Sequence, residues 1–176
     1  MIQIRQGVFE TNSSSTHAIS IMAYDKDKCN IPNTVTFSTD QNFGWEFEKY
    51  TDYISKAAYI WTTLCSRYCY LSNEKRLLDC KHRLTKILQD AGVENVLFAE
   101  NSYEDTPWGD EPYLGLDGYV DHYSDLNDMV DEMMNDPAML LSYLFDDRST
   151  VATGNDNDEH EPEFIDNAKW MIWKGN

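Results

Sequence analysis

Seven consecutive polar residues, 11–17, stand between two segments in which apolar residues alternate with polar ones, as they do in strands. Hydroxyl groups and the backbone N–H groups of a tight turn can hold a phosphate or another oxyanion. His17 can transfer a proton near neutral pH, and Ser14 is a candidate nucleophile if the histidine activates it. The alternative is a polar hairpin loop whose hydroxyls bond to their own backbone. The candidate ligand-binding residues are Arg5, Glu10, Asn12, Ser13, Ser14, Ser15, Thr16 and His17.

A second candidate site lies in residues 154–161, where asparagine and aspartate alternate after a glycine. Their oxygens are ligands that Ca²⁺ or Mg²⁺ accepts. An EF-hand loop beginning at Asp156 is excluded, because Glu161 stands where that loop needs glycine and Asn167 where it needs glutamate. A cation site here would therefore need help from the first polar segment. A solvated acidic turn and a contact for a basic partner remain alternatives. The candidate ligands for a divalent cation are Asn155, Asp156, Asp158 and His160.

The acidic residues are distributed unevenly along the chain, whose formal net charge is −17. Residues 93–166 hold 21 of the 31 acidic residues and a single basic one, Arg148. A protein that binds nucleic acid directly needs a basic surface, so we expect no such binding, nor attachment to an anionic membrane. The charge favours a basic partner, a cation or simple solubility. The residues expected to meet a basic partner are Glu104, Asp105, Asp110, Glu111, Asp121, Asp125, Asp128 and Glu132.

Hydrophobic periodicity indicates which elements position these residues. Strands are expected around residues 2–4 and 19–21, flanking a polar loop at 10–17, and at 34–37. A three- and four-residue spacing of apolar side chains predicts a long helix from Glu46 to Leu71. Ser72 and Asn73 can cap a second helix that Gly92 ends, and a buried strand is expected at 93–99.

The second half of the chain begins with a stretch rich in proline and glycine, 100–118, which predicts a packed surface loop. Two short helices follow, the first near 121–134 and the second capped by Asp136. A strand is expected at 150–153, whereas 168–174 fits a strand or a helix equally well. Together these elements predict a single α+β domain spanning 1–176, with a mixed or antiparallel sheet and the two long helices packed on one face.

Composition narrows the class of protein further. The chain is long enough for one domain with a normal core, and its apolar content of 41% is too high for a disordered acidic chain. No apolar run approaches a membrane span, and the first residues do not resemble a secretory signal. The four cysteines fit neither a disulfide framework nor a zinc pattern, so we expect reduced structural thiols in the cytoplasm.

The segment Glu10 to His17, with Arg5, Gly7 and Phe9 before it, resembles the opening of a loose group of uncharacterised phage and gut-bacterial proteins. The run from Thr153 to Asn157 is similar to a segment that some of them carry late in the chain. The resemblance covers about an eighth of the sequence and implies a mobile-element origin; it implies no reaction.

Two hypotheses follow. The first is a phage or mobile-element accessory protein, of the anti-CRISPR or anti-defence kind, that acts in the host cytoplasm. It would inhibit a basic nucleic-acid-handling host protein by presenting carboxylates that mimic a phosphate backbone, and it needs no catalytic group. The second is a small phosphate- or nucleotide-processing enzyme in which a divalent cation joins the segments 13–17 and 155–160. The first requires a concentrated acidic surface, and the second requires the two segments to be neighbours.

Overall fold

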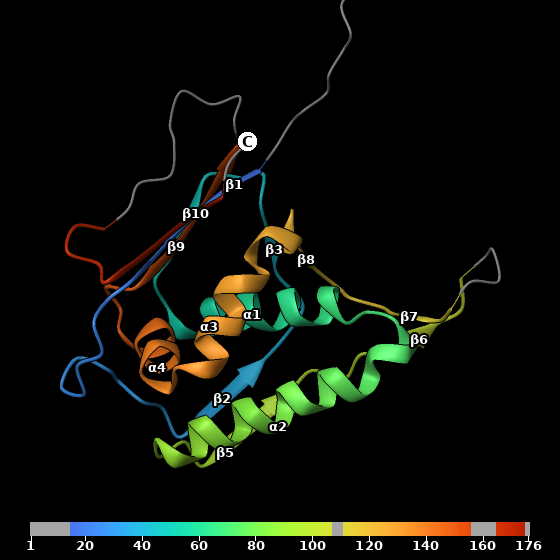
Figure 1. Cartoon of the computed structure of the whole chain (residues 1–176), viewed down its shortest axis with the longest axis horizontal. Helices are drawn as coiled ribbons and strands as arrows, with labels where there is room; N and C mark the ends of the chain where they lie inside the picture. Colours follow the sequence, from blue (N-terminus) through green and yellow to red (C-terminus); the bar gives the residue numbers. More distant parts are fainter. Residues whose placement is uncertain (1–14, 107–110, 156–164, 175–176) are drawn as a thin grey trace, which may run out of the picture.

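The computed structural model describes residues 15–106, 111–155 and 165–174, and it confirms the predicted α+β class (Figure 1). Its main sheet is antiparallel throughout, and the strand β1 has a neighbour on each side. The predicted strand at residues 2–4 lies outside the described residues. In spatial order the strands of this sheet are β10 (Trp170–Lys174), β1 (Ser15–Ile21), β9 (Thr150–Asn155) and β4 (Glu48–Tyr50).

The central helix α1 (Tyr53–Arg67) begins later than the periodicity predicts. Asp52 caps it, because its carboxylate accepts a hydrogen bond from the backbone N–H of Ser55 at 2.8 Å. The residues just before the cap form β4 instead, which pairs with β9. Tyr68 ends the helix and a short 3-10 helix, η1 (Leu71–Asn73), follows, so the prediction of one helix from 46 to 71 was wrong at both ends.

The second long helix, α2 (Glu74–Asp90), has the predicted bounds. Gly92 follows it with φ +107°, a left-handed conformation that glycine adopts without the steric cost of a Cβ atom. The helix packs against β5 (Asn95–Phe98) and α1, and its buried side chains are three leucines. β5 pairs in parallel with β2 (Thr34–Phe37), which the sequence also predicts.

The strand expected at 93–99 as buried is in fact half covered. Exposed and half-buried residues alternate along β5, and Leu97 is 52% exposed. The reason is that α2 packs against β5 while the alternate side chains, Asn95 and Leu97, lie on the opposite face and meet solvent.

The segment 100–118, expected as a packed loop, contains a short hairpin as well as irregular chain. The strands β6 (Tyr103–Glu104) and β7 (Tyr113–Leu114) pair antiparallel, and Figure 1 shows them at the end of the molecule farthest from the main sheet. A further short pair, β3 (Asn42–Phe43) with β8 (Tyr119–Val120), runs parallel beside α1.

The two predicted short helices are present. A 3-10 helix, η2 (Tyr123–Leu126), leads into α3 (Asn127–Asn135), whose buried side chains are methionine and valine. α4 (Pro137–Phe145) follows at once, and Asp136 caps it by accepting hydrogen bonds from the backbone N–H groups of Ala138 and Met139. Among the described residues no helix combines the length and the apolar character that crossing a membrane requires.

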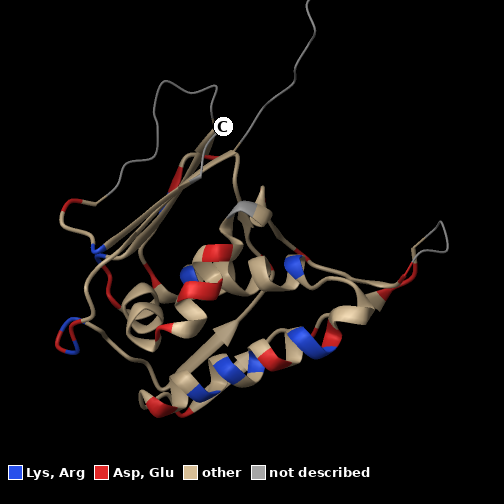
Figure 2. Ribbon diagram, viewed as in Figure 1, with Lys and Arg blue, Asp and Glu red and all other residues tan. Residues whose placement is uncertain are grey.

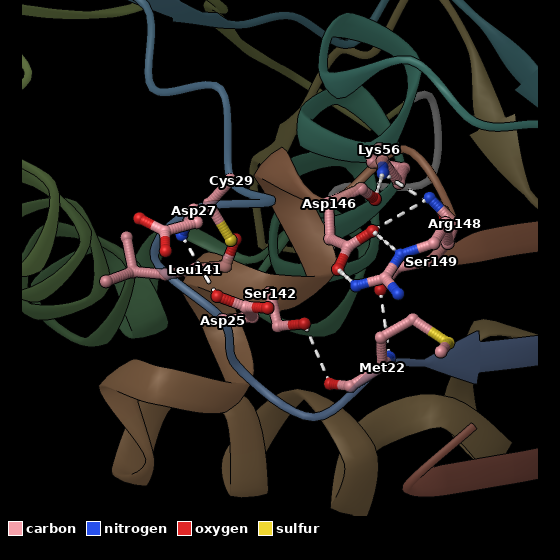
Figure 3. A network of polar contacts seen from close by, with 10 residues as sticks. All are labelled: Met22, Asp25, Asp27, Cys29, Lys56, Leu141, Ser142, Asp146, Arg148 and Ser149. Carbon is pink, nitrogen blue, oxygen red and sulfur yellow. Dashed lines mark hydrogen bonds and ion pairs between the residues drawn. The ribbon is translucent and has the colours of Figure 1, made fainter. Parts of the chain in front are cut away.

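A buried lysine joins α1 to the turn between α4 and β9 (Figure 3). The Lys56 ammonium donates to the backbone carbonyls of Asp146 at 2.9 Å and Ser149 at 3.0 Å. Burial lowers the pKa of Lys56 to about 8, although nearby carboxylates, Asp146 first among them, oppose that shift. Arg148 holds the fully buried Asp146 carboxylate through two side-chain hydrogen bonds of 2.9 and 2.6 Å. This network anchors the helical layer to the sheet.

The four cysteines are free, and burial raises the pKa of each thiol above its ordinary value. These thiols are therefore less reactive than exposed ones at neutral pH. The four-residue spacing of Cys65 and Cys69 would place both thiols on one face of the predicted helix, but Cys69 follows the end of α1 and is not part of it.

Candidate functional site

The described part of the first polar segment is strand rather than loop. Ser15, Thr16 and His17 are the first residues of β1, and all three are buried. The prediction of a polar loop at 10–17 was therefore wrong for residues 15–17, because β9 and β10 pair with the strand that contains them. The other candidates of this segment lie outside the described residues: Arg5, Glu10, Asn12, Ser13 and Ser14.

Buried side chains link β1 to α1 through a chain of hydrogen bonds. Ser15 Oγ lies 3.3 Å from His17 Nε2, and His17 Nδ1 lies 3.0 Å from the Tyr59 hydroxyl. Burial, and to a smaller extent the nearby Tyr50, raises the pKa of Tyr59 well above its ordinary value, so this hydroxyl stays protonated. Sequence reasoning missed Tyr59 as a member of this group, because helical spacing indicates only that it is core.

The second polar segment meets the first in the middle of the main sheet, where β1 begins and β9 ends. In the antiparallel register of β1 and β9, Ser15 is the partner of Asn155. The Asn155 side-chain amide donates to the Trp45 carbonyl at 3.1 Å. Asp156, Asp158 and His160 lie outside the described residues. Within the described ranges, histidine, cysteine, aspartate and glutamate form no group of three or more that is arranged to hold a metal ion.

Asp121, in the turn after β8, lies close to Gly44 and Ser15. A Cβ atom built on Gly44 would lie 2.7 Å from the Asp121 Cβ and 3.5 Å from the Ser15 Cβ, so the glycine permits this close approach. The Asp121 carboxylate also lies 3.8 Å from His122 Nε2. The sequence places Asp121 in the helix expected near 121–134, which is wrong, because α3 begins only after η2.

The predicted acidic residues fall into two groups that are well separated in Figure 2. One is on the β6–β7 hairpin and its flanks, where Glu104, Asp105 and Glu111 are exposed. The other is on α3, where Asp128 and Glu132 are exposed at an i, i+4 spacing. Asp110 lies outside the described residues, and the side chain of Asp125 does as well.

We use the name acidic arm for residues 100–106 and 111–117. It carries two carboxylates beyond those predicted, Glu100 and Asp117, and no lysine or arginine. A pocket of about 240 Å³ opens on the arm between Glu100, Glu104 and Asp117, with the ring of Tyr113 at its wall. The sequence signal for these residues is the absence of any basic residue from 94 to 147.

The two acidic groups differ in how far the protein neutralises them. On α3 the guanidinium of Arg67 donates to both Asp131 oxygens, at 2.7 and 3.0 Å, and offsets one carboxylate of that helix. On the arm the carboxylates contact neutral groups: Glu111 accepts from the backbone N–H of Ser72, and Glu104 accepts from the Tyr113 hydroxyl at 3.3 Å. The described arm therefore keeps its full negative charge.

No protein-family model matches the chain, and no curated protein and no solved structure is significantly similar to it.

Proposed function

We propose that this chain is a binding protein that captures a basic partner through the acidic arm. The observation that carries the proposal is a hairpin at the end of the molecule that bears five exposed carboxylates and no basic side chain in its described part. Such a surface attracts positive charge over about a Debye length, roughly 10 Å at moderate ionic strength, and speeds encounter with a basic protein.

The pocket on the arm supplies a specific binding site for one cationic side chain of the partner. The carboxylates of Glu100, Glu104 and Asp117 can accept hydrogen bonds from a guanidinium or ammonium group, and bidentate pairing makes arginine the better fit. Tyr113, which is 37% exposed, offers a ring face against which the same cation can rest. An arginine or lysine of the partner would thus be held by charge and by an aromatic wall.

The partner that suits this chemistry is a protein with a basic groove, such as a host enzyme that handles nucleic acid. An acidic arm in that groove would occupy the place of the phosphate backbone and inhibit the enzyme without a catalytic group of its own. The likeness of residues 10–17 to phage and gut-bacterial proteins supports an origin in a phage or mobile element, where a defence enzyme of the CRISPR type is a natural target.

A charge-matched pair of variants tests the proposal. The arm variant carries Glu100→Lys, Glu104→Lys and Asp117→Lys, and the control carries Asp27→Lys, Asp128→Lys and Glu132→Lys, so both change the net charge equally. The probe is a fluorescent arginine-rich peptide, and binding is followed by anisotropy at low and high salt. We expect the arm variant to weaken binding about tenfold or more and the control to weaken it far less.

Two outcomes would refute the arm as the binding surface. Equal weakening by both variants would mean that the peptide senses only the net charge. Binding by the wild type that does not change between low and high salt would exclude an electrostatic contact with exposed carboxylates.

A second candidate function is supported by the pairing of Ser15 with Asn155, which makes the two polar segments neighbours. In this candidate the chain is a phosphate- or nucleotide-processing enzyme, and a divalent cation is held beside the Ser15–His17–Tyr59 hydrogen bonds. Its test is hydrolysis of p-nitrophenyl phosphate with Mg²⁺ or Mn²⁺ by the wild type and by Ser14→Ala and Asp156→Ala variants. Activity that both substitutions abolish would establish it, and no activity with either metal would remove it.

A further inference from the structure

A pocket of about 390 Å³ lies between α1, α2 and the chain from β5 to β7, and Asn101 lines both this pocket and the one on the acidic arm. The volume falls in the range of small-molecule sites in proteins. Apolar side chains form much of its wall, and polar groups of α2 stand at its edge. The lining residues that the argument uses are Trp61, Leu77, Leu78, Lys81, Tyr103 and Leu114.

Two polar groups of this wall have no hydrogen-bond partner among the residues that the structure describes. Trp61 is 1% exposed and its indole N–H is unpaired, and the buried hydroxyl of Tyr103 is unpaired too. Leaving a buried donor unsatisfied costs free energy, and native proteins do so rarely. Both atoms lie behind the surface of the pocket, so a ligand can reach either donor only if the side chain turns toward it.

The charge at this pocket is positive on balance. Lys75 and Lys81 line it against one carboxylate, Glu74. Neither lysine forms an ion pair with any described residue within 4.0 Å. The Lys81 ammonium lies 5.4 Å from the ring centroids of both Trp61 and Phe98, a cation–π position that a flexible side chain can leave for an anion.

We propose that this pocket binds a small aromatic carboxylate. The ring of the ligand would pack against Leu77, Leu78 and Leu114, and its carboxylate would pair with the Lys81 ammonium. Tyr103 and Leu114 belong to the acidic arm, but none of the arm's carboxylates lines this pocket, so the failure of one proposal would not contradict the other.

The test uses a matched pair of probes, indole-3-acetate and its neutral amide, titrated into the full chain by calorimetry. The wild type should bind the carboxylate with a dissociation constant in the micromolar to millimolar range and the amide about tenfold more weakly. Lys81→Met should weaken carboxylate binding about tenfold while keeping an apolar stem in place. Lys86→Met removes the same charge from the exposed face of α2, where Lys86 pairs with Asp90, and should leave binding unchanged.

Three results would overturn this site: no heat with either probe at millimolar concentration, equal binding of the acid and the amide, or equal loss in the Lys81 and Lys86 variants. Circular dichroism of each variant shows whether α2 is intact. If Lys81→Met unfolds the helix, Lys75→Met serves in its place, because Lys75 lines the same pocket from an exposed position.

Discussion

The buried lysine of α1 makes the stability of the protein depend on pH in a way that can be calculated. The Lys56 side chain is fully buried, and burial lowers its pKa from 10.5 to about 8. Between these two values the unfolded chain binds a proton that the folded chain has released. The free energy of unfolding therefore rises with pH through this window. Below the window the buried ammonium lowers the stability of the fold by a constant amount.

The size of the effect follows from the two pKa values. A pKa of about 8 in the fold and 10.5 in the unfolded chain gives Lys56 a contribution that grows by about 1 kcal/mol between pH 7 and 9. Lys56→Met keeps a side chain of similar length and removes the titration. It also leaves the carbonyls of Asp146 and Ser149 unpaired, at a cost of about 1–3 kcal/mol for each group, which does not depend on pH.

The assay is urea unfolding of the wild type and of Lys56→Met at half-unit steps from pH 6.5 to 9. Cys65, Cys69 and Cys80 titrate in the same way in both proteins, so their effect cancels in the difference between the two curves. The charge of Lys56 lowers the pKa of Cys29, so both proteins also carry Cys29→Ser. The wild type should gain about 1 kcal/mol relative to the variant across this range. A difference in unfolding free energy between the two proteins that does not change with pH would refute the reasoning. If the variant does not fold, the ¹³Cε shift of Lys56 in the wild type decides: a midpoint near its ordinary pKa, above about 10, would contradict the burial argument.

Three further predictions concern stability. Asp136→Ala removes the cap of α4 and should lower the free energy of unfolding by about 1 kcal/mol, whereas Asp136→Asn should lose much less; equal losses would deny the capping role. Gly92→Ala places a side chain at φ +107° and should cost about 1 kcal/mol in chemical unfolding; no loss would mean that the chain relaxes there freely. Burial alone would raise the pKa of Asp146, but hydrogen bonds from Arg148 outweigh it and lower the pKa below 3.8, so its contribution is complete above that pH and is lost as the pH falls through the folded value. The gap in stability between the wild type and Asp146→Asn should therefore shrink below about pH 4, and a gap that stays constant down to about pH 2 would contradict this assignment.

Local signals were sufficient for the elements that carry their own caps and periodicity. α2 with Gly92 after it, α4 with Asp136 before it, and the strand at 34–37 each follow from a few neighbouring residues. The start of α1 could also have been predicted from Asp52, which caps the helix. The apolar spacing extends back to Tyr50, however, and it favoured an earlier start.

What the sequence could not supply depends on contacts between distant segments. Ser15–His17 looks like loop because it is polar, and it becomes buried strand because β9 and β10 pair with it and Tyr59 satisfies the histidine. The arm was expected only as part of a broad acidic stretch, and its pocket exists because the hairpin brings Glu104 beside Glu100 and Asp117. Asp121 was expected on the same helix as Asp128 and Glu132, but it lies in the turn after β8, where Gly44 permits its close approach.

The central claim, that a basic partner is bound at the acidic arm, is tested most directly by site-specific photocrosslinking in a bacterial lysate. A benzoylphenylalanine replaces Tyr113 on the arm, and in a second protein it replaces Leu78, an exposed residue of α2. The proposal predicts that the arm position yields a crosslink to a protein rich in lysine and arginine, that high salt abolishes it, and that the α2 position yields none. A partner that crosslinks at Leu78 but not at Tyr113, or crosslinked proteins no more basic than the lysate as a whole, would contradict the claim.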